Sequence, residues 1–138
     1  MMAFEREIAA FFASYVDAFA KNDADAIAEL WEPIGLFPSP NGNFAMEREA
    51  FRSHCVTLLD FYRQQGVVTP VGDLLSATLL YPQVAEARMA YRMLGEGGET
   101  VAAWDHIYIL RRSDDRWRVT LTISDGEIAA WTERGALE

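Results

Sequence analysis

Residues 84–110 read VAEARMAYRMLGEGGETVAAWDHIYIL, and over 84–94 apolar residues recur at every second position. In the first half these apolar positions are Ala85, Ala87, Met89, Tyr91 and Met93. Charged residues lie between several of them, which is typical of a strand with one buried and one solvated face. The glycine-rich segment at 95–98 predicts a tight turn, and a second strand follows from about 100 to 112. The stretch therefore predicts two consecutive strands joined as an antiparallel hairpin.

Further turn signals lie on both sides of this hairpin. Tyr81-Pro82-Gln83 precedes it and Ser113-Asp114-Asp115 follows it, so the chain from Val67 onward predicts four strands joined as a meander. The segment 36–46 contains two prolines and an Asn41-Gly42 pair, which favours short edge strands around a tight turn. On the last strand of the meander, one face is expected to carry Trp117, Val119, Leu121 and Ile123.

Three helices are expected before the meander. Aromatic and aliphatic residues recur at spacings of three and four from 4 to about 21, which is the pattern of an amphipathic helix. Asn22 or Asp23 can cap a short second helix, which includes Trp31 and ends at Pro33. A third helix from about 47 to 65 ends at Gly66. This order predicts an α+β domain, in which three N-terminal helices pack on the concave face of a curved antiparallel sheet.

The composition restricts the class of protein. With 138 residues, of which 51% are hydrophobic, the chain fits one domain over 1–138. Its 21 acidic and 12 basic residues give a net charge of -9, so neither nucleic acid nor an anionic membrane is expected as a partner. The single Cys55 allows no internal disulfide, and no segment is long and apolar enough to span a membrane, so we expect a cytoplasmic protein. His54 and Cys55 lack the spacing of metal ligands, and no metal is predicted.

Asp105 is the residue that suggests a functional site most strongly. It shares one face of its strand with Val101, Ala103, Ile107 and Ile109. A charge on an apolar face must meet a partner or stay protonated, and ionisable groups in apolar surroundings gather at functional sites. The sequence therefore predicts that Asp105 faces a pocket. A structural acid that accepts hydrogen bonds in the core explains the same pattern, so both interpretations stay open.

The opposite face of that strand carries Trp104, His106 and Tyr108. Because neighbouring strand residues point to opposite faces, these three are expected on the outer side of the sheet if Asp105 points inward. An apolar strip on the surface of a small protein is typical of an interface. We therefore expect Trp104, His106 and Tyr108 to form a contact surface.

Three segments resemble a known family. They are YVDAFAKNDADAIAELW at 15–31, AAWDHI at 102–107 and DRWRV at 115–119. With them, nearly the whole chain resembles the NTF2-like superfamily, close to its SnoaL-like and ketosteroid-isomerase-like branches. The resemblance implies a cone-shaped fold and a homodimer formed through the outer sheet face. It leaves the reaction open, because this superfamily includes isomerases, dehydratases, cyclases, epoxide hydrolases and binding modules.

The same resemblance implies two catalytic residues, Tyr15 and Asp105. They match the two donors that hold the substrate oxygen in ketosteroid-isomerase-like members, where a phenol and a protonated acid stabilise an enolate. The aspartate base of those isomerases is missing, because the corresponding stretch here is Pro38-Ser39-Pro40. A serine does not shuttle protons unaided. The residues that remain open as substitutes for the base are Ser39, Glu47, Asp60 and Asp73.

A ligand site is also expected, because flexible methionines and aromatic rings suit an apolar compound. The residues expected to line it are Trp31, Ser39, Met46, Tyr62, Met89 and Tyr91. The leading hypothesis is a cofactor-independent pocket protein for a small apolar carbonyl compound, with isomerisation, cyclisation or dehydration as candidate reactions. The alternative is a non-catalytic ligand-binding or dimeric interaction domain. A cavity on the order of several hundred Å³ that reaches Asp105 favours a pocket, whereas a packed core favours the interaction domain.

Overall fold

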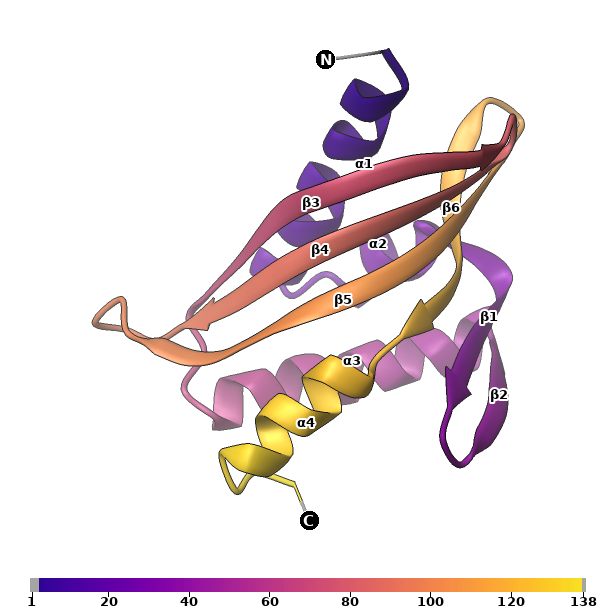
Figure 1. Ribbon diagram of the computed structural model, residues 1–138. Coiled ribbons are helices and arrows are strands. Elements are labelled where there is room, and N and C mark those ends of the chain that lie inside the picture. The colour runs from indigo at the N-terminus through magenta and orange to yellow at the C-terminus, as the bar shows by residue number, and fades with distance from the viewer. Residues whose placement is uncertain (1–2, 138) are drawn as a thin grey trace.

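Figure 1 shows the computed structural model of the chain, which describes residues 3–137. In chain order its elements are α1 (Ala3–Ala20), α2 (Ala24–Glu29), β1 (Trp31–Ser39), β2 (Gly42–Glu47), α3 (Arg48–Gln64), β3 (Thr69–Tyr81), β4 (Val84–Leu94), β5 (Thr100–Ser113), β6 (Arg116–Ile123) and α4 (Asp125–Glu133). The predicted α+β class is confirmed. The helix α4 was not predicted from the sequence.

The strands of the described chain form one curved six-stranded sheet in the order β2-β1-β6-β5-β4-β3. The strands β3 to β6 pair antiparallel with their neighbours in sequence, so the predicted meander is confirmed. The pair β1 and β6 is parallel. In Figure 1, α1 and α2 lie behind the meander, and α3 and α4 run along its lower side.

The segment before α3 differs from the prediction. The helix α2 ends at Glu29, and Trp31 begins β1 instead of closing the helix. The strand β1 lies between β2 and β6, so β2 alone of the two forms the sheet edge. The turn between them is held by Ser39, whose Oγ accepts a hydrogen bond from the Asn41 amide at 3.1 Å and donates to the Gly42 carbonyl at 3.0 Å. Gly42 has φ of +127°, a conformation that glycine adopts without a steric penalty.

The faces of β5 are the reverse of those predicted. Trp104, His106 and Tyr108 are 8%, 6% and 3% exposed and point to the concave side, whereas Asp105 is exposed on the outer side. The reason is the pairing register, which sets His106 opposite Met89 on β4. Residues directly opposite each other lie on the same face of a sheet, and Met89 belongs to the buried face of β4.

A β-bulge changes the sheet face to which the side chains in the second half of β6 point. Leu110 pairs with Val119, but Ile109 pairs with Leu121, so Thr120 is an extra residue in β6. One inserted residue transfers every later side chain to the other face. Val119 is therefore fully buried inside, whereas Leu121 lies outside beside Ile109. The expectation that Leu121 and Ile123 share a face with Val119 is wrong for this reason.

The core lies between the concave face of the sheet and the helices. The helix α1 contributes its buried stripe of Ile8, Phe12, Tyr15 and Ala18, as its spacing predicts. The buried face of α3 carries Phe51, Cys55, Leu59 and Tyr62. None of the helices within residues 3–137 is long and apolar enough to cross a membrane.

Candidate functional site

The helix α4 places one acid against the concave interior. Glu127 and Trp131 are four residues apart and therefore lie on the same side of the helix, where the Trp131 indole Nε1 donates to Glu127 Oε2 at 3.2 Å. The Tyr62 hydroxyl, from α3, donates to the same oxygen. Glu127 as a residue is half-buried, beside the buried rings of Tyr62 and Trp131. Burial raises the pKa of this carboxyl above its usual value, while the hydrogen bonds from Tyr62 and Trp131 act in the opposite direction.

Four buried tyrosines interact electrostatically with this carboxyl group, and one of them, Tyr62, donates a hydrogen bond to it. They are Tyr15 on α1, Tyr62 on α3, Tyr91 on β4 and Tyr108 on β5, each at most 7% exposed. Burial is the main cause that raises the pKa of each phenol, and the nearby charge of Glu127 adds to it in all four. Five elements therefore direct hydrogen-bonding side chains at one region, which we call the Glu127 cluster: Tyr15, Tyr62, Tyr91, Tyr108 and Glu127.

Each of these four hydroxyls has a defined partner, and that of Tyr62 is Glu127. The Tyr91 and Tyr108 oxygens are 2.8 Å apart, so one donates to the other. The Tyr15 oxygen accepts from the Trp31 indole Nε1 at 3.0 Å. A tyrosine oxygen that accepts one hydrogen bond still has a hydrogen to donate and a lone pair to offer. The cluster is thus a set of neutral donors and acceptors around one acid.

His106 lies beside the cluster. Its ring stacks on Tyr108 with centroids 4.8 Å apart, and its Nδ1 accepts from the Trp104 indole Nε1 at 3.0 Å. A neutral imidazole whose Nδ1 accepts carries its proton on Nε2. Burial lowers the pKa of His106 to about 4, so the ring is neutral at neutral pH.

A small cavity reaches the cluster from the surface. It holds about 40 Å³ between α1, α3 and the start of β3, and its apolar walls include Phe19, Leu59 and Val67. Tyr62 also lines it. Because Tyr62 also donates to Glu127, the cavity and the acid share this residue as a neighbour.

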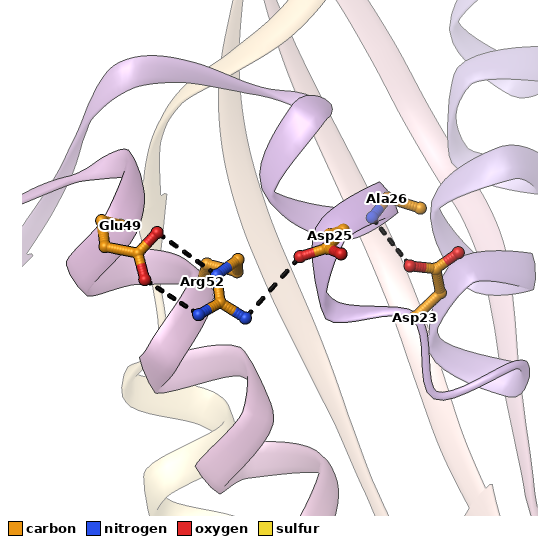
Figure 2. Close-up of polar contacts among 5 residues, drawn as sticks. All are labelled: Asp23, Asp25, Ala26, Glu49 and Arg52. Carbon is orange, nitrogen blue, oxygen red and sulfur yellow. Dashed lines mark hydrogen bonds and ion pairs between the residues drawn. The ribbon is translucent and has the colours of Figure 1, made fainter.

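A second depression of about 330 Å³ lies at the surface near the start of α2. Figure 2 shows its charged side chains: Arg52 lies between Glu49 and Asp25, and Asp23 accepts from the Ala26 amide at 3.0 Å. Arg52 Nη2 is 2.8 Å from Glu49 Oε1, whereas its Nη1 is 3.7 Å from Asp25. Arg52 pairs with Glu49 and Asp25, and Asp23 caps the start of α2. We therefore assign this region a structural role.

The structure separates the two residues predicted to be catalytic. Tyr15 is buried on the concave side, whereas Asp105 is exposed on the opposite face of the sheet. The two side chains therefore cannot meet at one substrate oxygen. Asp105 was expected to be buried because four apolar residues share its face, but that face is the outer one.

The residues predicted to line a ligand site divide into two groups. Trp31, Tyr62, Met89 and Tyr91 are buried on the concave side. Met46 and Ser39 belong to the β1–β2 hairpin, where Met46 is partly buried and the Ser39 hydroxyl holds the turn.

None of the acids considered as a substitute base lies in the Glu127 cluster. Glu47 and Asp73 are exposed, and Asp60 pairs with Arg63 on α3. The acid that does lie in it, Glu127, was missed because α4 was not predicted. Its signals were present in the sequence: Ser124 and acidic residues at a helix start, Ile128 and Trp131 at helical spacing, and Gly135 after the end.

The predicted contact surface is also corrected. Trp104, His106 and Tyr108 are buried within the chain and do not form an outer face. The outer face of the sheet instead carries Ile107, Ile109, Leu121 and Ile123, each only partly covered. Among residues 3–137, no group of His, Cys, Asp and Glu side chains is arranged to hold a metal ion.

Comparison with known proteins identifies the fold independently. Residues 6–127 match the family model described as NTF2-like protein (DUF6841). No curated protein matches the sequence. The matched segment ends at Glu127, so Trp131 and most of α4 lie outside it.

Solved structures with the same fold have low sequence identity to this chain. A cystatin-like domain of unknown function from Nostoc punctiforme has TM-score 0.71 and 18% identity, covering 89% of this chain and 76% of that one. A ketosteroid isomerase-like protein from Erwinia carotovora atroseptica has TM-score 0.66 and 16% identity, covering 86% and 92%. An NTF-2 like protein of unknown function from Shewanella oneidensis has TM-score 0.64 and 13% identity, covering 86% and 96%. With the family match over most of its length, the chain belongs to the NTF2-like family DUF6841.

Proposed function

We propose that this protein binds a small, largely apolar compound on the concave side of its sheet, at the Glu127 cluster. The observation that supports this most directly is the convergence of four tyrosines and one acid from five elements. Each polar group buried without full compensation costs about 1–3 kcal/mol, so an apolar core would be the simpler way to stabilise the fold. Hydrogen-bonding groups gathered in an otherwise apolar interior are typical of a ligand site.

The ligand would enter through the cavity between α1, α3 and β3. Its lining combines apolar residues such as Phe19 and Leu59 with the polar Asn22 and Arg63, and Tyr62, which also lines it, belongs to the cluster. A volume of about 40 Å³ has room for about one water. A larger guest would therefore require Tyr62 and α4 to move apart. Isomerisation, cyclisation or dehydration of the guest would also require a group that moves a proton, for which Glu127 and His106 are the candidates in this proposal.

A second candidate function is a dimeric interaction domain with a filled core. The size of the cavity favours it, because the cavity beside the cluster holds about 40 Å³ and does not reach Asp105, whereas a pocket was expected to hold on the order of several hundred Å³ there. Ring pairs in contact occupy much of the interior, including His106 with Tyr108 at 4.8 Å and Phe12 with Tyr108 at 4.9 Å. The partner would be a second copy of this chain, seated on the outer strip of Ile107, Ile109, Leu121 and Ile123. Arg88, which pairs with Glu86, lies opposite Ile107 beside this strip, and Asp105 precedes Ile107 by two residues on β5, so a two-fold copy could set opposite charges against each other.

The four tryptophans allow one experiment to separate the two candidates. Each indole N–H has a different partner: Trp31 with Tyr15, Trp104 with His106, Trp117 with Glu7, and Trp131 with Glu127. The four signals in a ¹H–¹⁵N spectrum would therefore report on separate positions.

The titration would use phenol and toluene, two probes of nearly equal size. We expect the Trp131 and Trp104 signals to shift, and the Trp117 signal to stay unchanged. Trp117 is a suitable internal control because it packs on Phe4, about 22 Å along α1 from Phe19 at the cavity. If neither probe shifts any indole signal, the ligand-binding proposal fails and the interaction domain is favoured.

A further inference from the structure

The hydrogen bonds of Glu127 are one-sided. The Tyr62 hydroxyl and the Trp131 indole both donate to Oε2, and within residues 3–137 no hydrogen bond ends on Oε1. An ionised carboxylate has about four lone-pair positions, and a protonated one has a hydrogen to donate as well. The two donors thus hold the carboxyl group in place and leave its second oxygen available.

The fixed donors come from different elements. Tyr62 extends from α3 and Trp131 from α4, where Trp131 is 1% exposed and packs against Phe61 with ring centroids 5.1 Å apart. A group held by two hydrogen bonds and a packed ring is preorganised, which lowers the entropy lost when a ligand binds. The orientation of Oε1 is therefore set before any ligand arrives.

We propose that Glu127 binds the polar atom of the ligand through Oε1, and that the ligand is a neutral compound with a hydroxyl or carbonyl group. This inference rests on the proposed function and names its anchoring residue and ligand class. A hydroxyl would donate to Oε1 of the carboxylate, and a carbonyl would accept from the protonated acid. The four tyrosines would contact the rest of the ligand as apolar walls with polar edges.

The charges around the site favour a neutral ligand over an anion. The cluster contains no lysine or arginine, and its one ionisable acid would repel a carboxylate or phosphate. The cation at the rim of the cavity, Arg63, is paired with Asp60. The net charge of -9 acts in the same direction.

The experiment compares probes of similar size with different polar groups on matched variants. The probes are phenol, benzaldehyde, benzoate and toluene, with dissociation constants taken from indole N–H titrations. The variants are Glu127→Leu, which removes the carboxyl group, and Glu127→Gln, which keeps an oxygen and a donor. The control is Glu133→Leu, since Glu133 is an exposed acid on the same helix.

We expect Glu127→Leu to raise the Kd of phenol and benzaldehyde by about tenfold, the value of one hydrogen bond, with toluene unchanged. Glu127→Gln should stay within about threefold of the wild type, and Glu133→Leu should match it. Phenol and toluene affinities that fall together in Glu127→Leu would indicate a packing role and overturn this inference, as would benzoate binding as tightly as phenol. Both results leave the pocket itself intact. Absence of all probe binding to the wild type would instead overturn the proposed function, and this inference with it.

Discussion

Stability between pH 7 and pH 5 should depend on His106. Burial lowers the pKa of its ring from 6.5 to about 4, so the folded state keeps it neutral where the unfolded chain protonates it. A group with a depressed pKa contributes stability above its unfolded value, and this contribution is lost as the pH falls towards the folded value. The rings in contact with it, those of Trp104, Tyr91 and Tyr108, carry no charge in this range. The loss therefore begins near pH 6.5.

The size of this loss follows from the shift. One pKa unit corresponds to about 1.4 kcal/mol, so the full difference between 6.5 and about 4 amounts to about 3 kcal/mol. At pH 5 the unfolded histidine is almost fully protonated and the folded one is almost fully neutral. The part lost by pH 5 spans about 1.5 units, which is about 2 kcal/mol.

The assay is urea unfolding of wild type and His106→Asn at several pH values from 7 to 5. Asparagine keeps an acceptor near the position of Nδ1 for the Trp104 indole and does not titrate. The free energy that His106→Asn loses through altered packing is the same at each pH, and the pH-dependent contributions of the other titratable groups are common to both proteins. The wild type should therefore lose about 2 kcal/mol more than the variant across this range.

The matched control is His54→Asn. His54 is the other histidine of the chain, and it is exposed to solvent. Its pKa is lowered by partial burial, so we expect a smaller change in slope. Parallel curves for wild type and His106→Asn would refute the reasoning, since they would mean that the folded ring titrates like the unfolded one.

Three further results are expected. In urea unfolding, Glu127→Gln should gain stability relative to the wild type as the pH rises above about 4.5. The reason is that a carboxyl group with a raised pKa stabilises the folded state only while it stays protonated. A difference in unfolding free energy between the two proteins that stays constant from pH 4 to 7 would contradict this. In the same assay, Trp131→Ala should lower the unfolding free energy by about 3–5 kcal/mol, because Trp131 is 1% exposed and packs α4 against α3. A loss below about 1 kcal/mol would show that α4 is not packed in this way. If the proposed dimer forms through the outer strip, Ile109→Lys should convert it into a monomer by light scattering, because the lysine charges this strip. The control is Asp73→Lys at an exposed site on β3, which β4 separates from β5. A mass unchanged from the wild type would exclude this strip as the contact.

The order of helices and strands could be predicted because each has a clear period. Helix α1 has apolar residues at spacings of three and four, and β4 alternates between apolar and charged residues. The faces of β5 could not be assigned in this way, because both carry apolar residues: Ile107 and Ile109 outside, Trp104 and Tyr108 inside. Only the register against β4 distinguishes them.

The charge of Asp105 is itself a signal for the outer face of β5. A carboxylate is far more often exposed than buried, and on a strand with two apolar faces it marks the one nearer to solvent. The bulge at Thr120 cannot be recognised in the hydrophobic pattern of the sequence, because Leu121 and Ile123 continue the alternation that begins at Trp117. Pairing geometry decides such a change of face, and a single strand does not contain that information.

Tyr15, Tyr62 and Tyr91 could be selected from the sequence because each lies on an apolar stripe. Glu127 could not, because its environment arises from contacts 65 residues apart along the chain. It is the only acid that the structure, as described from residue 3 to 137, combines with this ring of phenols. The family match ends at Glu127, whereas Trp131, which fixes its carboxyl group, lies in the segment beyond. The matched segment covers the sheet and most of the first three helices, and it includes Tyr62, one of the two donors to Glu127. If the proposed function holds, the second donor, Trp131 in the last part of α4, would help to set which oxygen of the acid meets the ligand.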